Sequence, residues 1–140
     1  MFKNRNPESK NCKIQIKSQF QNPNKDNKIY DIRERTFNFA KRILELGGKL
    51  PNNHVCRILS SQLVRAGTSI GANVEEADGT VTKRDLINKF VIARKEAKET
   101  KYWIRLISGK YLPNEVVSSD LKEINEIINV LSAIINKLRK

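Results

Sequence analysis

The chain has 140 residues, of which 27 are Lys or Arg and 15 are Asp or Glu, so its formal net charge is +12. This length suits one domain with its own core. The charge favours a polyanionic partner, with nucleic acid first and an anionic membrane surface second. Cys12 and Cys56 form neither a disulfide framework nor a zinc-ligand spacing. Because no window is long and apolar enough for a signal peptide or a membrane span, we expect a soluble protein of the reducing cytoplasm.

The N-terminal residues 1–28 are rich in Asn, Lys and Gln and poor in large apolar side chains. Such a segment buries too little apolar surface to offset the cost of ordering it. We therefore predict a flexible basic arm over residues 1–28 and a folded domain over residues 29–140. The alternation of Ile14 and Ile16 is also compatible with a short strand, and the arm's cations with phosphate contacts.

Two helices are predicted in the first half of the domain. The first is capped by Asp31 and ends at Gly47, Gly48 and Pro51. Its apolar residues are Ile32, Phe39, Ala40, Ile43 and Leu46. The second opens near Asn52 or Asn53 and stops at Gly79. Its apolar residues are Val55, Leu59, Leu63, Ala66, Ile70, Val74 and Ala77.

Two further helices complete the predicted fold. Thr82 caps the third, with Asp85 in its first turn. Its seam is Leu86, Phe90, Ala93, Ala97, Thr100, Ile104 and Ile107. The fourth is predicted to begin at Ser118 or Ser119, after a break at Ser108, Gly109 and Pro113. Its seam is Leu121, Ile124, Ile128, Leu131, Ile135 and Leu138, widened by Ile127, Val130 and Ile134. Four amphipathic helices with short links predict an all-α, antiparallel up-down-up-down four-helix bundle.

Gly67 and Gly71 lie inside the second predicted helix, four residues apart and hence on one face. An interior Gly costs a helix about 1 kcal/mol relative to Ala. A phosphate-binding loop would need Lys and then Ser or Thr after the last Gly, where this chain has Ala72 and Asn73. We therefore predict close helix packing, and we assign it to the hairpin of the second and third helices.

Polar residues interrupt the seams of the same two helices. Arg65, Asn73, Glu75 and Glu76 lie on the second helix, and Glu96 and Glu99 lie on the third. In a hairpin that turns at Gly79, Arg65 falls opposite Glu96 and Glu99, and an ion pair there would set the helix register. A metal site or an acid/base pair would need histidines or isolated carboxylates in a pocket, so we favour the structural interpretation.

Cations recur along one side of the third predicted helix at four-three-four spacing. They are Arg94, Lys98, Lys101 and Arg105, with Lys83 and Arg84 near the start of the helix. Tyr102 and Trp103 lie among them and offer rings on which unpaired bases stack. The alternative is a solvated charged face with both aromatic rings packed into the bundle or against a second subunit.

Catalytic and cofactor chemistry have little support in the sequence. His54 is the single histidine, and no nucleophile motif accompanies it. A helical RNase that uses Arg and His six positions apart would need Arg where this chain has Lys49. We predict no enzyme activity, no catalytic residue, no metal and no cofactor.

Three segments carry a family resemblance: YDIRERTFNFAKRI, RAGTSIGANVEEADG and TKRDLINKFVIARKEAKETKYWIRLI. They resemble the four-helix-bundle proteins encoded by intervening sequences in bacterial 23S ribosomal RNA genes, formerly labelled S23 proteins. That family includes the accessory variability protein of diversity-generating retroelements. The resemblance covers about residues 29–140. The central-motif positions matched are Arg65, Asn73, Glu76, Glu96 and Glu99.

The resemblance implies a homopentamer with a basic, nucleic-acid-binding surface and no catalytic residues. In retroelement relatives it implies a reverse transcriptase and RNA as partners. Our leading hypothesis is a non-enzymatic oligomeric bundle that binds RNA or DNA with little sequence specificity. The alternative is a scaffold whose apolar helix faces, above all the wide face of the fourth helix, bind a protein partner or further copies of the chain.

Overall fold

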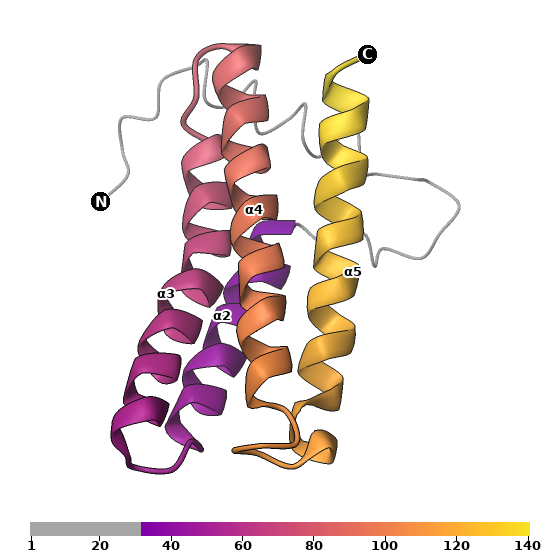
Figure 1. Cartoon of the computed structure of the whole chain (residues 1–140). Helices are drawn as coiled ribbons and strands as arrows, with labels where there is room; N and C mark the ends of the chain where they lie inside the picture. The colour runs from indigo at the N-terminus through magenta and orange to yellow at the C-terminus, as the bar shows by residue number, and fades with distance from the viewer. Residues whose placement is uncertain (1–31) are drawn as a thin grey trace.

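The computed structural model describes residues 32–140, and these form four helices. The helices are α2 (Ile32–Gly48), α3 (His54–Ala77), α4 (Lys83–Ile107) and α5 (Asn114–Leu138). Successive helices run in opposite directions and are joined by short loops at alternate ends of the bundle (Figure 1). α3 packs against α2 and α4, and α5 packs against α4 and α2. The predicted all-α four-helix bundle is therefore confirmed.

Several predictions lie outside the described residues. They are the basic arm over residues 1–28, the short strand at Ile14 and Ile16, and the cap at Asp31. Within residues 32–140, no helix is long and apolar enough to cross a membrane. The same residues contain no extended strand, only an isolated bridge between Ser108 and Leu112 in the loop after α4.

The starts of α3 and α4 follow the predicted capping signals. The Asn53 side chain accepts a hydrogen bond from the backbone N–H of Cys56 at 2.8 Å. The Thr82 hydroxyl accepts one from the backbone N–H of Asp85 at 3.1 Å. Each cap satisfies one of the N–H groups that a helix leaves unpaired in its first turn. The loop after α4 turns at Gly109, whose φ of +81° is readily adopted by glycine.

The core agrees closely with the predicted seams of α2 and α4. All seven predicted α4 residues are buried, as are four of the five predicted α2 residues, the half-buried Ala40 being the fifth. The α3 seam needs one correction at its start. Val55 is 49% exposed, whereas Cys56 is buried. The first turn of α3 thus presents its cysteine to the core and its valine to solvent.

The start of α5 was predicted wrongly, because the helix begins at Asn114 and not at Ser118 or Ser119. Pro113 occupies the cap position without a side-chain cap, so this start lacks the polar signal that marks α3 and α4. The early turns are held by packing instead, since Val117 is buried. Ile127 and Ile134 are fully buried in the bundle's own core, and Val130 is half-buried. The wide apolar face of α5 therefore serves mainly the fold.

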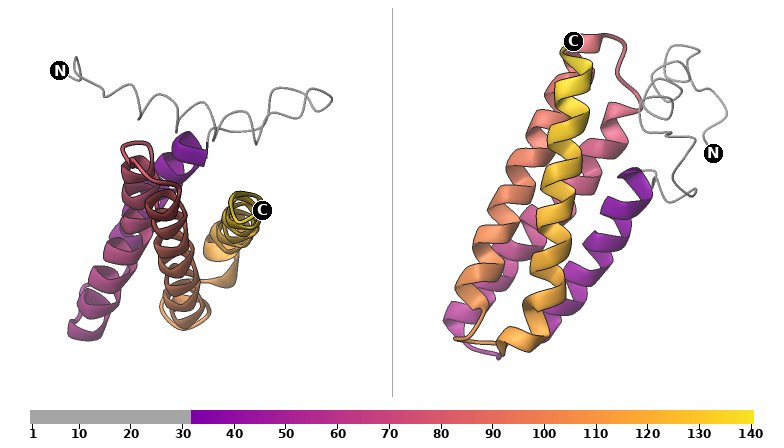
Figure 2. Two further views of the ribbon diagram at one scale, coloured as in Figure 1. Left: turned by 90° about the horizontal axis from the view of Figure 1, so that it is seen from above. Right: turned by 90° about the vertical axis from the view of Figure 1, so that its right-hand side faces the viewer.

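The glycines of α3 face a different helix from the one predicted. A Cβ at Gly67 would lie 2.6 Å from Cγ2 of Ile43, and a Cβ at Gly71 would lie 3.4 Å from the backbone of Thr36. Both neighbours belong to α2, so the small residues permit the close approach of α2 to α3 and not that of α4. Two further views show α2 beside α3 and α5 beside α4 (Figure 2).

Candidate nucleic-acid interface

The edge of α4 that faces α3 carries paired charges. Arg65 of α3 donates to Glu99 at 2.5 Å and to Glu96 at 3.4 Å. Toward the loop between the two helices, Lys89 pairs with Glu76 at 2.6 Å. Asn73 does not bridge the helices, because its amide donates to the Ser69 carbonyl one turn back in α3, at 2.8 Å. The predicted pairing of Arg65 with Glu96 and Glu99 is thus present.

The two glutamates of this cluster have opposite pKa shifts. The hydrogen bond from Arg65 holds the pKa of Glu99 below its usual value. Burial and the neighbouring Glu99 carboxylate raise the pKa of Glu96. The Arg65 side chain remains 48% exposed. One guanidinium shared by two carboxylates joins α3 and α4 at an open helix seam, and it gives no enclosed site for acid/base chemistry.

A second set of ion pairs joins α2 to α5, and sequence reasoning missed it. Arg35 contacts Glu123 at 2.6 Å and Glu126 at 2.5 Å. Arg42 contacts Asp120 at 2.7 Å. The hydrogen bonds that Arg35 donates to Glu123 raise the pKa of Arg35 further above its usual value. The three acidic residues recur at a spacing of three, which marks one face of α5, and that signal could have been read from the sequence.

The opposite edge of α4 faces α5 and carries the predicted cations. Arg94 donates to the Ser132 hydroxyl of α5 at 3.4 Å, and Lys83 Nζ lies 3.4 Å from the carbonyl of Lys140. Helical spacing places the remaining cations on the same side as Arg94. We call this set the cationic stripe: Lys83, Arg94, Lys98, Lys101 and Arg105. Arg84 is exposed beside its first member.

The cationic stripe is unpaired among the described residues. No member of the stripe forms an ion pair within residues 32–140. Beyond the first turns of α4 and α5, every carboxylate of these helices pairs with an arginine of α2 or α3. Those carboxylates are Glu96, Glu99, Asp120, Glu123 and Glu126. The α4 edge beside α5 therefore concentrates positive charge without local neutralisation.

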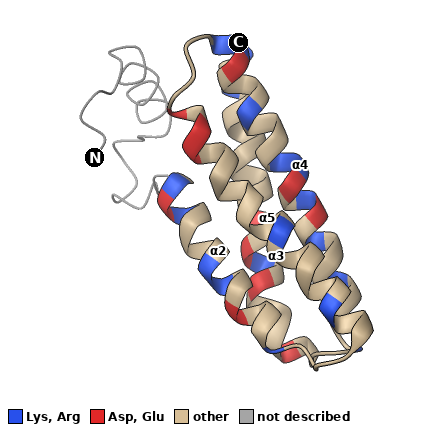
Figure 3. Ribbon diagram, turned by 90° about the vertical axis from the view of Figure 1, so that its left-hand side faces the viewer, with Lys and Arg blue, Asp and Glu red and all other residues tan. Residues whose placement is uncertain are grey.

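On the α5 side, the positions next to the stripe between Asn125 and Asn136 are uncharged. Positions three, four or seven residues from Ser132 share its side of the helix, and they include Asn125, Ile128 and Asn136, with Arg139 near the C-terminus. The view from the left of Figure 1 shows a different pattern, with acidic and basic positions mixed over the helices (Figure 3). The charge of the bundle is thus distributed unevenly around its axis.

The two aromatic residues of α4 differ in position. Tyr102 is 53% exposed and follows Lys98 by one turn, so it lies along the outer margin of the cationic stripe. Trp103 is half-buried and packs against the core, on the α3 side of the helix. The rings meet edge-on, with centroids 5.1 Å apart and planes at 69°. Of the two predicted stacking residues, only Tyr102 is placed to accompany the stripe.

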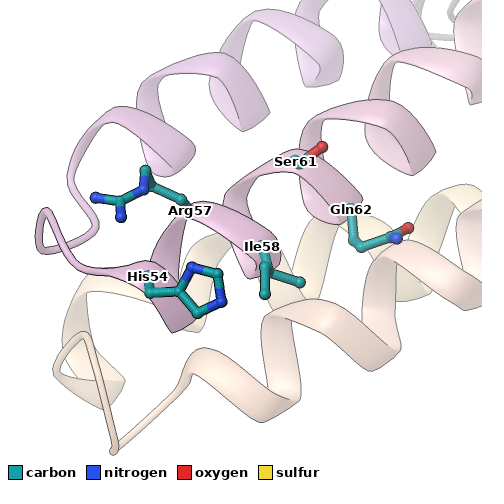
Figure 4. Close-up of a pocket in the computed structure, with 5 residues that line it drawn as sticks. All are labelled: His54, Arg57, Ile58, Ser61 and Gln62. Atoms are coloured by element: carbon teal, nitrogen blue, oxygen red, sulfur yellow. The ribbon is translucent and has the colours of Figure 1, made fainter.

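Two open hollows lie elsewhere on the bundle. One, of about 350 Å³, is formed by the outer side of the first turns of α3, by His54, Arg57, Ile58, Ser61 and Gln62 (Figure 4). The other, of about 410 Å³, lies between α2 and α5 around Arg35 and its glutamates. His54 has no carboxylate or thiol among the residues that line its hollow. Within residues 32–140, no three His, Cys, Asp or Glu side chains are grouped to hold a metal.

Comparison with known proteins gives one family and a solved structure. Residues 28–133 match the family model of the 23S rRNA-intervening sequence protein. The fold is similar to the crystal structure of a protein of unknown function from the S23 ribosomal protein family of Bacteroides thetaiotaomicron. That chain is 40% identical, the TM-score is 0.69, and the match covers 74% of this chain and 97% of the other. No curated protein matches the sequence.

Proposed function

Because the chain belongs to the family of 23S rRNA-intervening sequence proteins, we propose that it is a non-enzymatic, oligomeric four-helix bundle that binds RNA or DNA through α4. The observation that carries this proposal is the cationic stripe, which no described carboxylate neutralises. Four arginines of α2 and α3 form ion pairs, namely Arg33, Arg35, Arg42 and Arg65. A row of cations left unpaired is suited to phosphate.

Binding of this kind draws its free energy from the release of counterions. Each cation that neutralises a phosphate displaces a condensed ion from the nucleic acid, so affinity falls steeply as salt rises. Phosphate contacts position a protein without reading bases. The proposal therefore predicts strong salt dependence and little sequence preference.

A matched pair of triple variants tests the site. The first, Lys98→Gln with Lys101→Gln and Arg105→Gln, removes three stripe cations. The control, Lys41→Gln with Lys49→Gln and Arg57→Gln, removes two lysines and one arginine from exposed positions on α2, the following loop and α3. Both variants lower the net charge from +12 by three, to +9. Any difference between them therefore reports position and not total charge.

We expect fluorescence anisotropy at about 50 mM salt to show binding to labelled RNA and DNA, with dissociation constants below about 100 μM. Loss of three phosphate contacts should reduce the slope of log affinity against log salt by about 2 to 3. The control variant should keep most of the wild-type slope. Equal slopes for the two variants, or no salt-sensitive binding by the wild type, would refute the proposal.

The proposal includes no enzyme activity. The polar clusters join helices through arginine and carboxylate groups, and the residues that line the hollow at His54 include no carboxylate or thiol. The role belongs to the cytoplasm, where nucleic acid is accessible and a buried free thiol such as that of Cys56 persists. No cofactor is part of the proposal.

The second candidate is a scaffold that binds a protein partner, such as a reverse transcriptase, or further copies of the chain as a pentamer. Ile127 and Ile134, which widen the apolar face of α5, are buried in the bundle's own core and are not exposed to a partner. The exposed apolar residues Phe37, Leu44 and Ile58 still favour a protein contact. Light scattering at low and at about 1 M salt tests this second candidate, because apolar association survives salt that screens phosphate binding. A monomer at micromolar concentration under both conditions would refute self-assembly, which both candidates include.

A further inference from the structure

We propose that the cationic stripe binds a single strand of nucleic acid, whose phosphates follow α4 while one unpaired base stacks on Tyr102. This inference rests on the proposed function and adds the structural class of the ligand. It depends on the shape of the stripe, on the exposure of one aromatic ring, and on the uncharged part of the α5 edge between Asn125 and Asn136.

The stripe is straight and narrow. From Arg94 to Arg105 the cations advance by four, three and four residues, which is about 6, 4.5 and 6 Å along the helix axis. Such steps are comparable with the spacing of consecutive phosphates on an extended strand. A flexible single strand can follow the whole row. The phosphates of a duplex strand follow a helical path and leave a straight row after a short distance.

Tyr102 supplies the feature that distinguishes a single strand from a duplex. Its ring is half exposed and lies on the same side of the helix as Lys98 and Arg105, one turn from each. Trp103, half-buried, meets the Tyr102 ring in a T-shaped contact and forms no parallel stack on a face of that ring. A base can stack on such a face only where it is not already paired and stacked within a duplex.

The neighbouring edge of α5 is compatible with bases rather than with a second row of phosphates. Asn125 and Asn136 are exposed, and Ser132 already contacts Arg94. These side chains donate and accept hydrogen bonds but carry no charge. The cations thus lie along one line, with polar groups on one side and an aromatic ring on the other. One nucleic-acid backbone can lie along this line of cations.

The test compares a 12-nucleotide uridine strand, a 12-nucleotide thymidine strand and a 12-base-pair DNA duplex by fluorescence anisotropy, at one low salt concentration. We expect both single strands to bind at least about five-fold more tightly than the duplex. Tyr102→Ala should weaken binding of the strands by about 5- to 100-fold, the range found for loss of one base stack, and leave the duplex unchanged. Tyr102→Phe keeps the ring and should stay within about two-fold of wild type.

Failure of the inference can be told from failure of the proposed function. If the Lys98, Lys101 and Arg105 triple variant weakens all ligands but Tyr102→Ala weakens none, the stripe binds nucleic acid and the stacking proposal is wrong. Equal or tighter binding of the duplex overturns the single-strand proposal in the same way. A requirement for ribose or for deoxyribose would also overturn it, because the proposed contacts reach only phosphates and base faces. Absence of binding to any ligand overturns both.

Discussion

Replacing Gly67 with alanine tests how closely α2 approaches α3. The added Cβ would lie 2.6 Å from Cγ2 and 2.9 Å from Cγ1 of Ile43, which is fully buried and has no solvent to move into. Overpacking of this kind costs about 1–3 kcal/mol. Exchange of Gly for Ala inside a helix returns about 1 kcal/mol. We therefore expect Gly67→Ala to lower the free energy of unfolding by roughly 1 kcal/mol, within a range of about 0 to 2 kcal/mol.

Gly71→Ala is the matched control, because it makes the same exchange one turn later in the same helix. Its Cβ would lie 3.4 Å from the backbone of Thr36, at the edge of ordinary van der Waals contact. Little steric overlap then offsets the gain in helix propensity, and we expect Gly71→Ala to raise the free energy of unfolding by between zero and about 1 kcal/mol. The propensity terms cancel between the variants, so their difference of about 1–3 kcal/mol measures the overpacking at Ile43.

Urea unfolding followed by circular dichroism measures these differences, and a double-mutant cycle with Ile43→Ala assigns them. Ile43→Ala alone should cost about 2–5 kcal/mol. In the Gly67→Ala background it should cost less, because the new methyl group occupies part of the vacated space, with a coupling energy of about 0.5–3 kcal/mol. Additive effects, or a Gly67→Ala variant as stable as Gly71→Ala, would refute the close contact of Gly67 with Ile43.

Three further predictions concern substitutions in the α3–α4 hairpin, each measured as a urea midpoint. Thr82→Ala should cost about 1 kcal/mol through loss of the hydroxyl that caps α4. The pKa of Glu99 is lowered in the folded state, so its pairing with Arg65 stabilises the fold above the unfolded pKa, and this stabilisation is lost as pH falls through the folded pKa. Glu99→Gln should therefore be destabilising at pH 7 and match wild type in strong acid. The pKa of Glu96 is raised in the folded state, so ionisation of Glu96 lowers the stability of the fold as pH rises. Glu96→Gln should therefore be better tolerated at pH 7 than Glu99→Gln.

The helices themselves could be predicted well because their signals are local. The α4 seam repeats without interruption, and Thr82 and Asp85 mark its start with side chains that bond there. The start of α5 could not be predicted in the same way. Pro113 contributes no side-chain cap, and the turn that follows is stabilised by burial of Val117 against other helices. Tertiary packing at that position replaces the local signal on which a sequence argument depends.

Ion pairs were predictable where the chain itself fixes the geometry. Arg65 and Glu96 lie on consecutive helices joined by a short loop, so an antiparallel hairpin brings them together by counting residues from Gly79. Arg35 and Glu123 are 88 residues apart, on the first and last described helices. Their pairing depends on how the bundle closes and on the rotation of α5 about its axis. Neither is determined by any one loop.

The glycines of α3 show how such a rotation bears on the proposed function. Gly67 and Gly71 indicated that some helix approaches α3 closely, but periodicity alone does not say which. Because α2 packs on the glycine face of α3, α4 contacts α3 on the side that carries Arg65. This contact places Glu96 and Glu99 of α4 beside α3. The opposite side of α4 is left with cations alone. Glu96 and Glu99 therefore add little to the potential at the stripe, and replacing both with glutamine should leave the salt dependence of nucleic-acid binding close to wild type.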